Sequence, residues 1–383
     1  MIETKSLRQS LSLQLTSSFF VFLWCLIASF PIFWITIMSI KLPVDAFSSN
    51  PITVIFGPLT SQERASISLN ELIILSLLIF VLYKLRLRFF IIFNQFLRFN
   101  FILKVPLFYL CLSILFLFLF RALNFLLEQL NFIDFEILGF TFEHYKTVWF
   151  ERDFFKYFWN SVIVTSGVVI VSLTFGTLAG FALARYKSSL AFWILVIALV
   201  FRALPHSILV AGYLPFFMNS SEILRPLLGD LAPTLFGKPF AVIAVLVAIN
   251  QPFTIWLMRS FFQNIPSELD EAARIDGCSH FQAFIKIIMP IMWPGVITTG
   301  LFSFMLGYND YLVTSLLLDA QNQTMVPAIS GLFNRDTSTT DQVVAVAAAV
   351  SITAPLFLLV LFFSKTNCKR SYRWCCQRLK EEI

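Results

Sequence analysis

The chain has 383 residues, of which 58% are hydrophobic and only 13% are charged, and its mean hydropathy is +0.81. A soluble protein of this length cannot bury so large an apolar fraction, so the composition excludes a soluble globular protein and indicates a polytopic membrane protein. The net charge of +6 comes from basic residues that flank hydrophobic segments. Membrane topology and anionic lipid account for this distribution without nucleic acid.

Six hydrophobic segments are long enough to cross about 30 Å of hydrocarbon as helices. In chain order they are 19–40, 161–185, 190–213, 240–257, 296–318 and 343–364. Two shorter segments, 69–83 and 105–120, are borderline, because apolar runs of this length can also lie in the interface or re-enter. Gly176 and Gly180 form a G-x-x-x-G motif, which favours close helix packing over ligand binding. We predict an all-α polytopic membrane protein with six core transmembrane helices and an extra hairpin, which makes eight spans.

Lysine and arginine set the orientation of these spans, because they are retained on the cytoplasmic side of short loops. Most of the 28 basic residues fall on one side when the N-terminus is cytoplasmic. Both termini are then cytoplasmic, and the segment 121–157, in which acidic residues outnumber basic ones, is external. Whether the chain has six spans or eight, the residues after the hairpin lie on the same sides of the membrane.

The spans and loops suggest five parts of the chain. These are a cytoplasmic N-terminus with the first span (1–44), a segment with the two borderline runs (45–130), an external loop (131–157), a core with the remaining spans (158–365) and a basic cytoplasmic tail (366–383).

Residue patterns exclude several kinds of site. The six cysteines lie in spans or on the predicted cytoplasmic side, so no external disulfide framework is expected. Cys375 and Cys376 lack a second pair at zinc-ligand spacing. His144, His206 and His280 fall in different predicted compartments, so we expect no metal site. The chain has no P-loop, H-E-x-x-H or G-x-S-x-G motif, so a partner must supply any energy that it uses.

The loop 263–293 is predicted to hold two short helices that meet at a glycine. Its first part reads ELDEAARIDG over 268–277. Ser267 is a candidate N-cap, with Asp270 three residues on as a variant capping box. Gly277 can end this helix in the left-handed conformation that favours glycine.

The second helix of this loop has its own start and stop signals. Ser279 and Gln282 form a capping box, and Pro290 is predicted to end the helix. Apolar side chains recur at helical spacing, at Phe281, Phe284, Ile285, Ile288 and Met289. From these signals alone the loop is either an element that docks on a partner or an ordinary, well-capped interfacial loop.

A spaced motif in this loop resembles a known family. The pattern E-A-A, three residues, G, nine residues and I-x-x-P falls at Glu271, Ala272, Ala273, Gly277, Ile287 and Pro290. It resembles the EAA signature of permease subunits of ABC importers. Further matches resemble the carbohydrate subgroup, in particular the smaller maltose-type permease: Asp276, Pro294-Gly295, Asn309-Asp310-Tyr311, Asn160-Ser161 and Ala184-Arg185-Tyr186. The similarity covers residues 140–365, with a weaker match over the first span.

The resemblance implies a type I ABC importer permease bundle in the bacterial cytoplasmic (inner) membrane, and a chain that is no enzyme. The ELDEAARIDG helix would be the coupling helix, which sits in a cleft of a nucleotide-binding subunit. Glu271 would make the charged contact, and Ala272 and Ala273 would allow a close fit. Asp276 and Gly277 would shape the turn, and the proline of the motif would end the second helix near the membrane.

The resemblance also implies the partners of this chain. They are ABC ATPase subunits, which bind ATP and Mg²⁺, a second and larger permease subunit, and an extracytoplasmic solute-binding protein. No cofactor and no metal are expected in this chain. ATPase closure would rock the spans, so that a central cavity alternates between outward and inward access.

The solute implied by the resemblance is a sugar or a sugar-like molecule. A non-sugar solute, such as glycerol phosphate, a polyol or a polyamine, would leave the coupling unchanged. A polytopic membrane enzyme that acts on a lipid-linked substrate is a third hypothesis, but no carboxylate or histidine cluster favours it.

Polar residues inside the spans are candidates for the substrate pathway or its gating, because they are costly in hydrocarbon and usually face a bundle interior or a cavity. The candidates are Arg202, Asn250, Tyr308, Asn309 and Asp310, and the polar residues His206, Gln251 and Tyr311 lie beside them. A pairing of Arg202 with Asp310 would satisfy both charges.

Two segments depart from the family pattern. The segment 45–130 stands where the smaller permease has only an external loop. The tail 366–383 is basic and cysteine-bearing, where a short glycine-containing segment that touches the ATPase is expected. Anionic lipid is the alternative partner of this tail.

Overall fold

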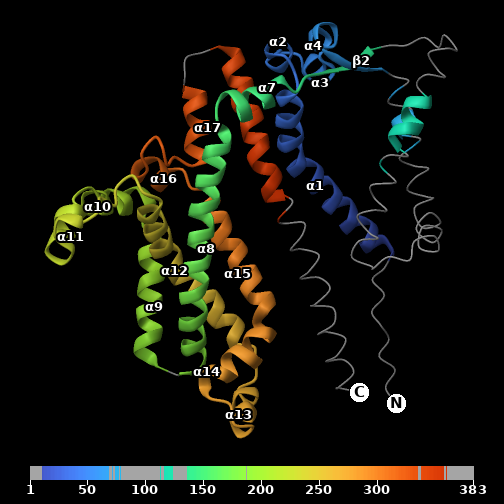
Figure 1. The fold of residues 1–383 in the computed structure, drawn as a ribbon. Helices are drawn as coiled ribbons and strands as arrows, with labels where there is room; N and C mark the ends of the chain where they lie inside the picture. Colours follow the sequence, from blue (N-terminus) through green and yellow to red (C-terminus); the bar gives the residue numbers. More distant parts are fainter. Residues whose placement is uncertain are drawn as a thin grey trace, which may run out of the picture. The chain divides into compact units, whose positions relative to one another are not determined.

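The computed structural model of the chain is mostly helical (Figure 1). It describes residues 11–68, 136–186, 188–334 and 338–357, together with residues 71, 74–76, 78, 113, 116–123 and 359. The chain divides into two compact units, Met1–Tyr145 with Thr337–Ala347, and Lys146–Asp336 with Ala348–Ile383.

Five helices in the described part of the chain are long and apolar enough to cross a membrane. They are Leu15–Ser39, Phe154–Arg185, Pro239–Gln263, His280–Asn309 and Thr339–Phe357. A bent pair of helices is a sixth candidate. The prediction of a helical polytopic membrane protein is confirmed. The borderline segments 69–83 and 105–120 lie mostly outside the described residues, as does the tail 366–383.

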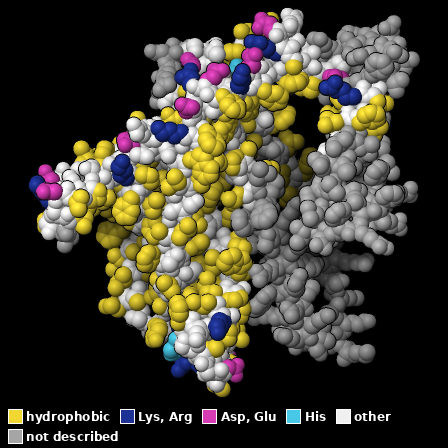
Figure 2. Space-filling view, in the orientation of Figure 1, with side chains coloured by type: hydrophobic (Ala, Val, Ile, Leu, Met, Phe, Trp, Pro, Cys, Tyr) yellow, Lys and Arg dark blue, Asp and Glu magenta, His cyan; other side chains and the backbone are white. Residues whose placement is uncertain are grey.

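The second unit is a bundle in which α8, α12 and α15 pack side by side (Figure 1). Its elements are η1 (Thr147–Glu151), α8 (Phe154–Arg185), α9 (Ser189–Arg202), α10 (His206–Met218), α11 (Ser220–Leu228), η2 (Gly229–Leu231), α12 (Pro239–Gln263), α13 (Glu268–Ile275), α14 (His280–Ala283), η3 (Phe284–Ile288), α15 (Met289–Asn309), α16 (Leu312–Leu317) and α17 (Met325–Asn334). Figure 2 shows apolar side chains along the length of this bundle.

Glycines bring α8 and α12 close together. A Cβ atom on Gly176 would lie 2.4 Å from Cγ2 of Thr254, and one on Gly180 would lie 2.7 Å from Cβ of Met258. Neither position has room for a side chain. The G-x-x-x-G motif is therefore a helix-packing motif, as predicted.

The segment predicted as one span over 190–213 consists of two helices. α9 ends at Arg202, α10 begins at His206, and the two helices are bent by 98°. Pro205 has no N–H to donate, and its ring disfavours helical backbone at the residue before it. Its own backbone is extended, at φ −56° and ψ 130°. The prediction of one continuous span is therefore wrong.

The segment predicted as a span over 296–318 also divides. α15 ends at Asn309, and Asp310 is extended, at φ −68° and ψ 126°. The Asp310 carboxylate accepts a hydrogen bond of 3.0 Å from the backbone N–H of Thr314, which lies in α16. Short polar side chains that bond the backbone favour a helix start over a helix interior. The predicted continuation of the span to residue 318 is therefore wrong.

The first unit contains the first span and a small folded cap. Its elements are α1 (Leu11–Ser39), α2 (Pro43–Ala46), α3 (Pro51–Phe56), α4 (Pro58–Glu63), β1 (Ala65–Ser68), β2 (Glu136–Phe140) and α7 (Glu143–Lys146). β1 and β2 pair antiparallel, from Ala65 opposite Phe140 to Ser68 opposite Glu136. The all-α prediction lacks this sheet. Residues 45–68, predicted as part of one insertion up to residue 130, fold with residues 136–145 in this cap.

A buried lysine holds the cap together. The Lys41 side chain is fully buried, and its Nζ donates hydrogen bonds to the carbonyl oxygens of Gly139 and Phe56, the latter at 3.1 Å. The His144 ring bonds the Lys41 carbonyl at 2.9 Å. Burial lowers the pKa of Lys41 from 10.5 to about 8, against the smaller opposing effect of the Asp45 carboxylate. Burying the charged form of Lys41 therefore destabilises the folded cap.

The pH dependence of stability tests this account. Between pH 8 and pH 10.5 the unfolded chain keeps a proton on Lys41 that the folded chain releases, so the contribution of Lys41 to stability rises with pH across this window. We expect the thermal unfolding midpoint of the wild type to rise relative to that of Lys41→Met over this range. Lys146→Met, which removes an exposed lysine, is the control and should follow the wild type. Parallel pH profiles for the wild type and Lys41→Met would contradict the account.

Candidate functional site

The loop 263–293, called the coupling loop after the role that the resemblance predicts for it, turns at a glycine. Gly277 has φ +89°, in the region that favours glycine. The Cys278 N–H donates to the Ala273 carbonyl at 3.0 Å, and the Gly277 N–H donates to the Arg274 carbonyl at 3.1 Å. This pair of bonds is a Schellman motif, which satisfies the last carbonyls of α13. The predicted left-handed glycine is confirmed.

The two predicted helix caps of the loop have different outcomes. The Ser279 side chain accepts from the Gln282 N–H, and the Gln282 side chain accepts from the Ser279 N–H, so this capping box is confirmed. Ser267 caps nothing, because its backbone is helical, at φ −71° and ψ −23°. Its predicted partner Asp270 pairs instead with Arg185. The capping-box prediction for Ser267 is therefore wrong.

Pro290 does not end the second helix. The chain passes from α14 through η3, a π-helical segment over Phe284–Ile288, into α15, where Pro290 lies in the first turn. Proline is tolerated in a first turn, because the N–H that it lacks needs no intrahelical partner there. The π segment changes the hydrogen-bond register just before it. One apolar helical path therefore runs from His280 to Asn309, and the predicted stop at Pro290 is wrong.

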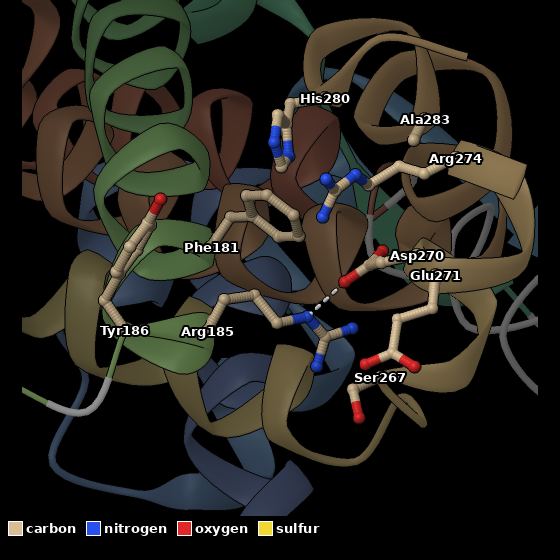
Figure 3. Close-up of a pocket in the computed structure, with 9 residues that line it drawn as sticks. All are labelled: Phe181, Arg185, Tyr186, Ser267, Asp270, Glu271, Arg274, His280 and Ala283. Atoms are coloured by element: carbon tan, nitrogen blue, oxygen red, sulfur yellow. Dashed lines mark hydrogen bonds and ion pairs between the residues drawn. The ribbon is translucent and has the colours of Figure 1, made fainter. Parts of the chain in front are cut away.

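An ion pair joins the coupling loop to the end of α8 (Figure 3). Arg185 Nε lies 2.5 Å from Asp270 Oδ2, and Arg185 Nη1 donates to the Ile265 carbonyl at 3.0 Å. The guanidinium carbon lies 5.7 Å from the centre of the Phe181 ring. The sequence showed Arg185 only as part of a family motif. A basic residue in the last turn of a helix is the signal that could have identified it.

A pocket of about 290 Å³ lies beside this ion pair (Figure 3). It is lined by Phe181, Arg185, Tyr186, Ser267, Asp270, Glu271, Arg274, His280 and Ala283. The lining joins α8 to both short helices of the coupling loop. Charges of both signs therefore lie next to one another at the end of the bundle.

The motif residues of the loop differ in exposure. Glu271, Ala272, Asp276 and Gly277 are exposed, whereas Ala273 is only 1% exposed and is buried within the chain. Of the two alanines predicted to fit closely against a partner, only Ala272 lies at the surface. Large apolar side chains of the same loop are also exposed, at Ile275, Phe281 and Ile285.

Two of the residues predicted to line the substrate pathway are instead packed inside the bundle. Asn250 is 2% exposed, and its Nδ2 donates to Ser303 Oγ at 2.8 Å and to Ser172 Oγ at 3.4 Å. Tyr308 is 5% exposed, and its hydroxyl donates to the Ile352 carbonyl at 2.7 Å. Because both side chains are buried and bonded, they hold helices together in this structure.

The predicted pairing of Arg202 with Asp310 is wrong. The Arg202 guanidinium lies over the Phe253 ring, with its carbon 4.6 Å from the ring centre. Asp310 interacts electrostatically with His206, the first residue of α10. The break after Arg202 thus places a different basic residue near Asp310. Asn309 is exposed at the end of α15.

Together, the spans and the charged two-helix loop at the end of the bundle define a membrane permease. A family model described as binding-protein-dependent transport system inner membrane component matches residues 172–370. The chain belongs to this family of transporter permeases, so it is a multi-pass inner-membrane protein and not an enzyme.

Individual relatives are transport permeases as well. The chain is 30% identical over 244 residues to the maltodextrin transport system permease protein MdxG of Bacillus subtilis, covering 64% of this chain and 81% of that protein. It is 33% identical over 187 residues to the diacetylchitobiose uptake system permease protein DasC of Streptomyces coelicolor, covering 48% of this chain and 63% of that protein. A solved structure of a bacterial ABC transporter involved in alginate import is similar with a TM-score of 0.48 and 21% identity, covering 62% of this chain and 84% of that one.

The turn at Gly277 is the first test of the site. A Cβ atom there would meet nothing within 4 Å, so any effect of Gly277→Ala arises from the positive φ angle, at a cost of about 1 kcal/mol. We expect Gly277→Ala to loosen the coupling loop and to raise its cleavage rate in limited proteolysis. Gly212→Ala, at a helical glycine with equally open surroundings, is the control and should leave the rate unchanged. Equal cleavage rates for Gly277→Ala and the wild type would contradict the requirement for glycine at this positive φ angle.

Proposed function

We propose that this chain is the transmembrane permease subunit of an ATP-driven importer for a sugar or related solute, and that α13 is the helix that its ATPase grips. The observation that carries the proposal is the exposure of Glu271 and Ala272 on a short helix at the end of the bundle. The relatives named above for maltodextrin and diacetylchitobiose uptake support a carbohydrate solute.

The coupling loop is built to pass on movement. α13 is short and exposed, while α14 continues through η3 into α15 without a break. Closure of an ATPase dimer would displace α13 and, through this continuous path, tilt α15 within the bundle. Such a rigid displacement can switch a central cavity between outward and inward access. ATP and Mg²⁺ belong to the ATPase, and this chain contributes the surface on which the force acts.

The remaining partners follow from the same mechanism. A second, larger permease subunit would complete the cavity, and an extracytoplasmic solute-binding protein would deliver the solute. A loaded binding protein can drive the cycle only if it binds the two states with unequal affinity. The distribution of basic residues supports cytoplasmic N- and C-termini, with the coupling loop on the same side.

The helix breaks are the best candidates for the substrate pathway. Arg202 and His206 flank the break between α9 and α10, and Asn309 and Asp310 lie where α15 ends. Interrupted helices expose backbone and polar side chains at membrane depth, where transporters build solute sites. We therefore propose Arg202, His206, Asn309 and Asp310 as pathway residues.

A charge reversal at Glu271 tests the coupling contact. Because like charges in a desolvated contact cost several kcal/mol, we expect Glu271→Lys to lower ATP-dependent uptake of radiolabelled maltodextrin by about tenfold or more, with normal membrane insertion. Glu222→Lys makes the same change at an exposed acid of α11, away from the loop, and should keep wild-type uptake. Normal uptake by Glu271→Lys would show that Glu271 does not contact the ATPase.

A natural cysteine offers a direct test of the partner. Cys278 is a free thiol directly after Gly277. In inverted membrane vesicles, a bifunctional thiol crosslinker should join it to an ATPase subunit, and nucleotide should alter the yield because the contact moves during the cycle. Cys278→Ser should abolish the product. A wild-type loop that forms no product with the ATPase in the assembled complex would contradict the proposal.

A further inference from the structure

We propose that Arg185 is a positioning residue that fixes the coupling helix to α8, so that a displacement of α13 is carried into α8 as well as into α15. The inference rests on the proposed function, in which α13 is the helix that the ATPase moves. It concerns how the movement enters the bundle.

One side chain connects three parts of the second unit. The Arg185 guanidinium contacts Asp270 in α13 at 2.5 Å and the carbonyl of Ile265, in the turn between α12 and α13, at 3.0 Å. It also lies over Phe181 of its own helix. Phe181 in turn packs on Phe284 of η3, with ring centres 4.8 Å apart. Arg185 therefore links the end of α8 to the start of the coupling loop (Figure 3).

The helix ends strengthen this pair. Arg185 is in the last turn of α8, and Asp270 is in the first turn of α13. A cation is favoured at a helix C-terminus and an anion at an N-terminus, so each charge is stabilised by its own helix as well as by its partner. The two side chains are only 17% and 19% exposed, so water screens them little. The ion pair between Arg225 and Asp230, at 71% and 91% exposure, lacks this protection.

Most of α13 is exposed. Ala273 is its only buried residue, and Ile275 is 86% exposed. A small apolar contact resists sliding poorly, whereas a directional ion pair fixes orientation. Arg185 Nη2 and Asp270 Oδ1 are buried without a hydrogen-bond partner among the described residues. An arginine and a carboxylate can share two parallel bonds, so these atoms can form the second bond when α13 is displaced.

Thiol labelling on α8 tests the inference without a known solute. Phe155→Cys places a probe in the first turn of α8, at a side chain that is 56% exposed. In the complete complex in proteoliposomes, a non-hydrolysable ATP analogue should change the labelling rate of this probe. Adding Arg185→Gln or Asp270→Asn should reduce that change by about tenfold. The two substitutions together should reduce it no further, because they remove one interaction.

Controls separate this inference from the proposed function. Arg259→Gln removes another cation that is tied to α8, through the Leu183 carbonyl at 3.4 Å. Arg259 forms no ion pair with α13 among the described residues, so this variant should keep the nucleotide response. The Cys278 crosslink to the ATPase should persist in Arg185→Gln, which shows that the variant is folded and assembled. A nucleotide response within about twofold of wild type in Arg185→Gln, with the crosslink intact, would overturn the inference. A missing crosslink in the wild type would instead overturn the proposed function.

Discussion

Inside a bilayer no water pairs with a backbone N–H or carbonyl group, and the second unit depends on this constraint. α8, α12 and α15 satisfy their backbones internally, which leaves packing and a few side-chain bonds to hold them together. Gly176 and Gly180 allow α12 to pack directly on α8, at Thr254 and Met258. Asn250 then adds hydrogen bonds to α8 and α15 at a depth where an unpaired amide would be costly.

The interruptions of this backbone pattern coincide with the proposed functional positions. At the end of α15, the Asp310 carboxylate takes over a backbone donor that the broken helix leaves free. Before Pro290, a π segment adjusts the hydrogen-bond register so that the helix continues into the membrane. After α13, the Schellman motif closes the helix at Gly277. A bundle that is rigid between such points can transmit movement from one of them to another.

Local signals in the sequence were sufficient where the structure is decided locally. The positive φ of Gly277 and the capping box of Ser279 and Gln282 depend only on neighbouring residues, and both were predicted. The Ser267 cap failed because the backbone of Ser267 is helical, and the Asp270 side chain of the predicted box pairs instead with Arg185, 85 positions away along the chain. A pattern of neighbouring residues cannot reveal an ion pair with a residue so far away along the chain.

Prolines and buried polar residues show the same limit. α12 runs through Pro252 and α15 through Pro294, whereas Pro205 separates two helices. Whether a helix continues through a proline depends on whether neighbouring helices compensate for the missing backbone hydrogen bond. The sequence alone does not reveal those neighbours. Asn250 and Tyr308 were predicted as pathway residues because polar groups in hydrocarbon are costly. In the structure, hydrogen bonds to Ser303 and to the Ile352 carbonyl offset that cost inside the bundle.

The first unit shows how a small sheet brings together two stretches that lie far apart in the sequence. β1 and β2 place the two ends of the intervening residues side by side, because paired strands hold opposite residues about 5 Å apart. A Cβ atom on Gly139 would lie 2.2 Å from the Ser61 nitrogen, so β2 rests against α4 at a distance that only glycine allows. The strand is therefore fixed by the cap itself.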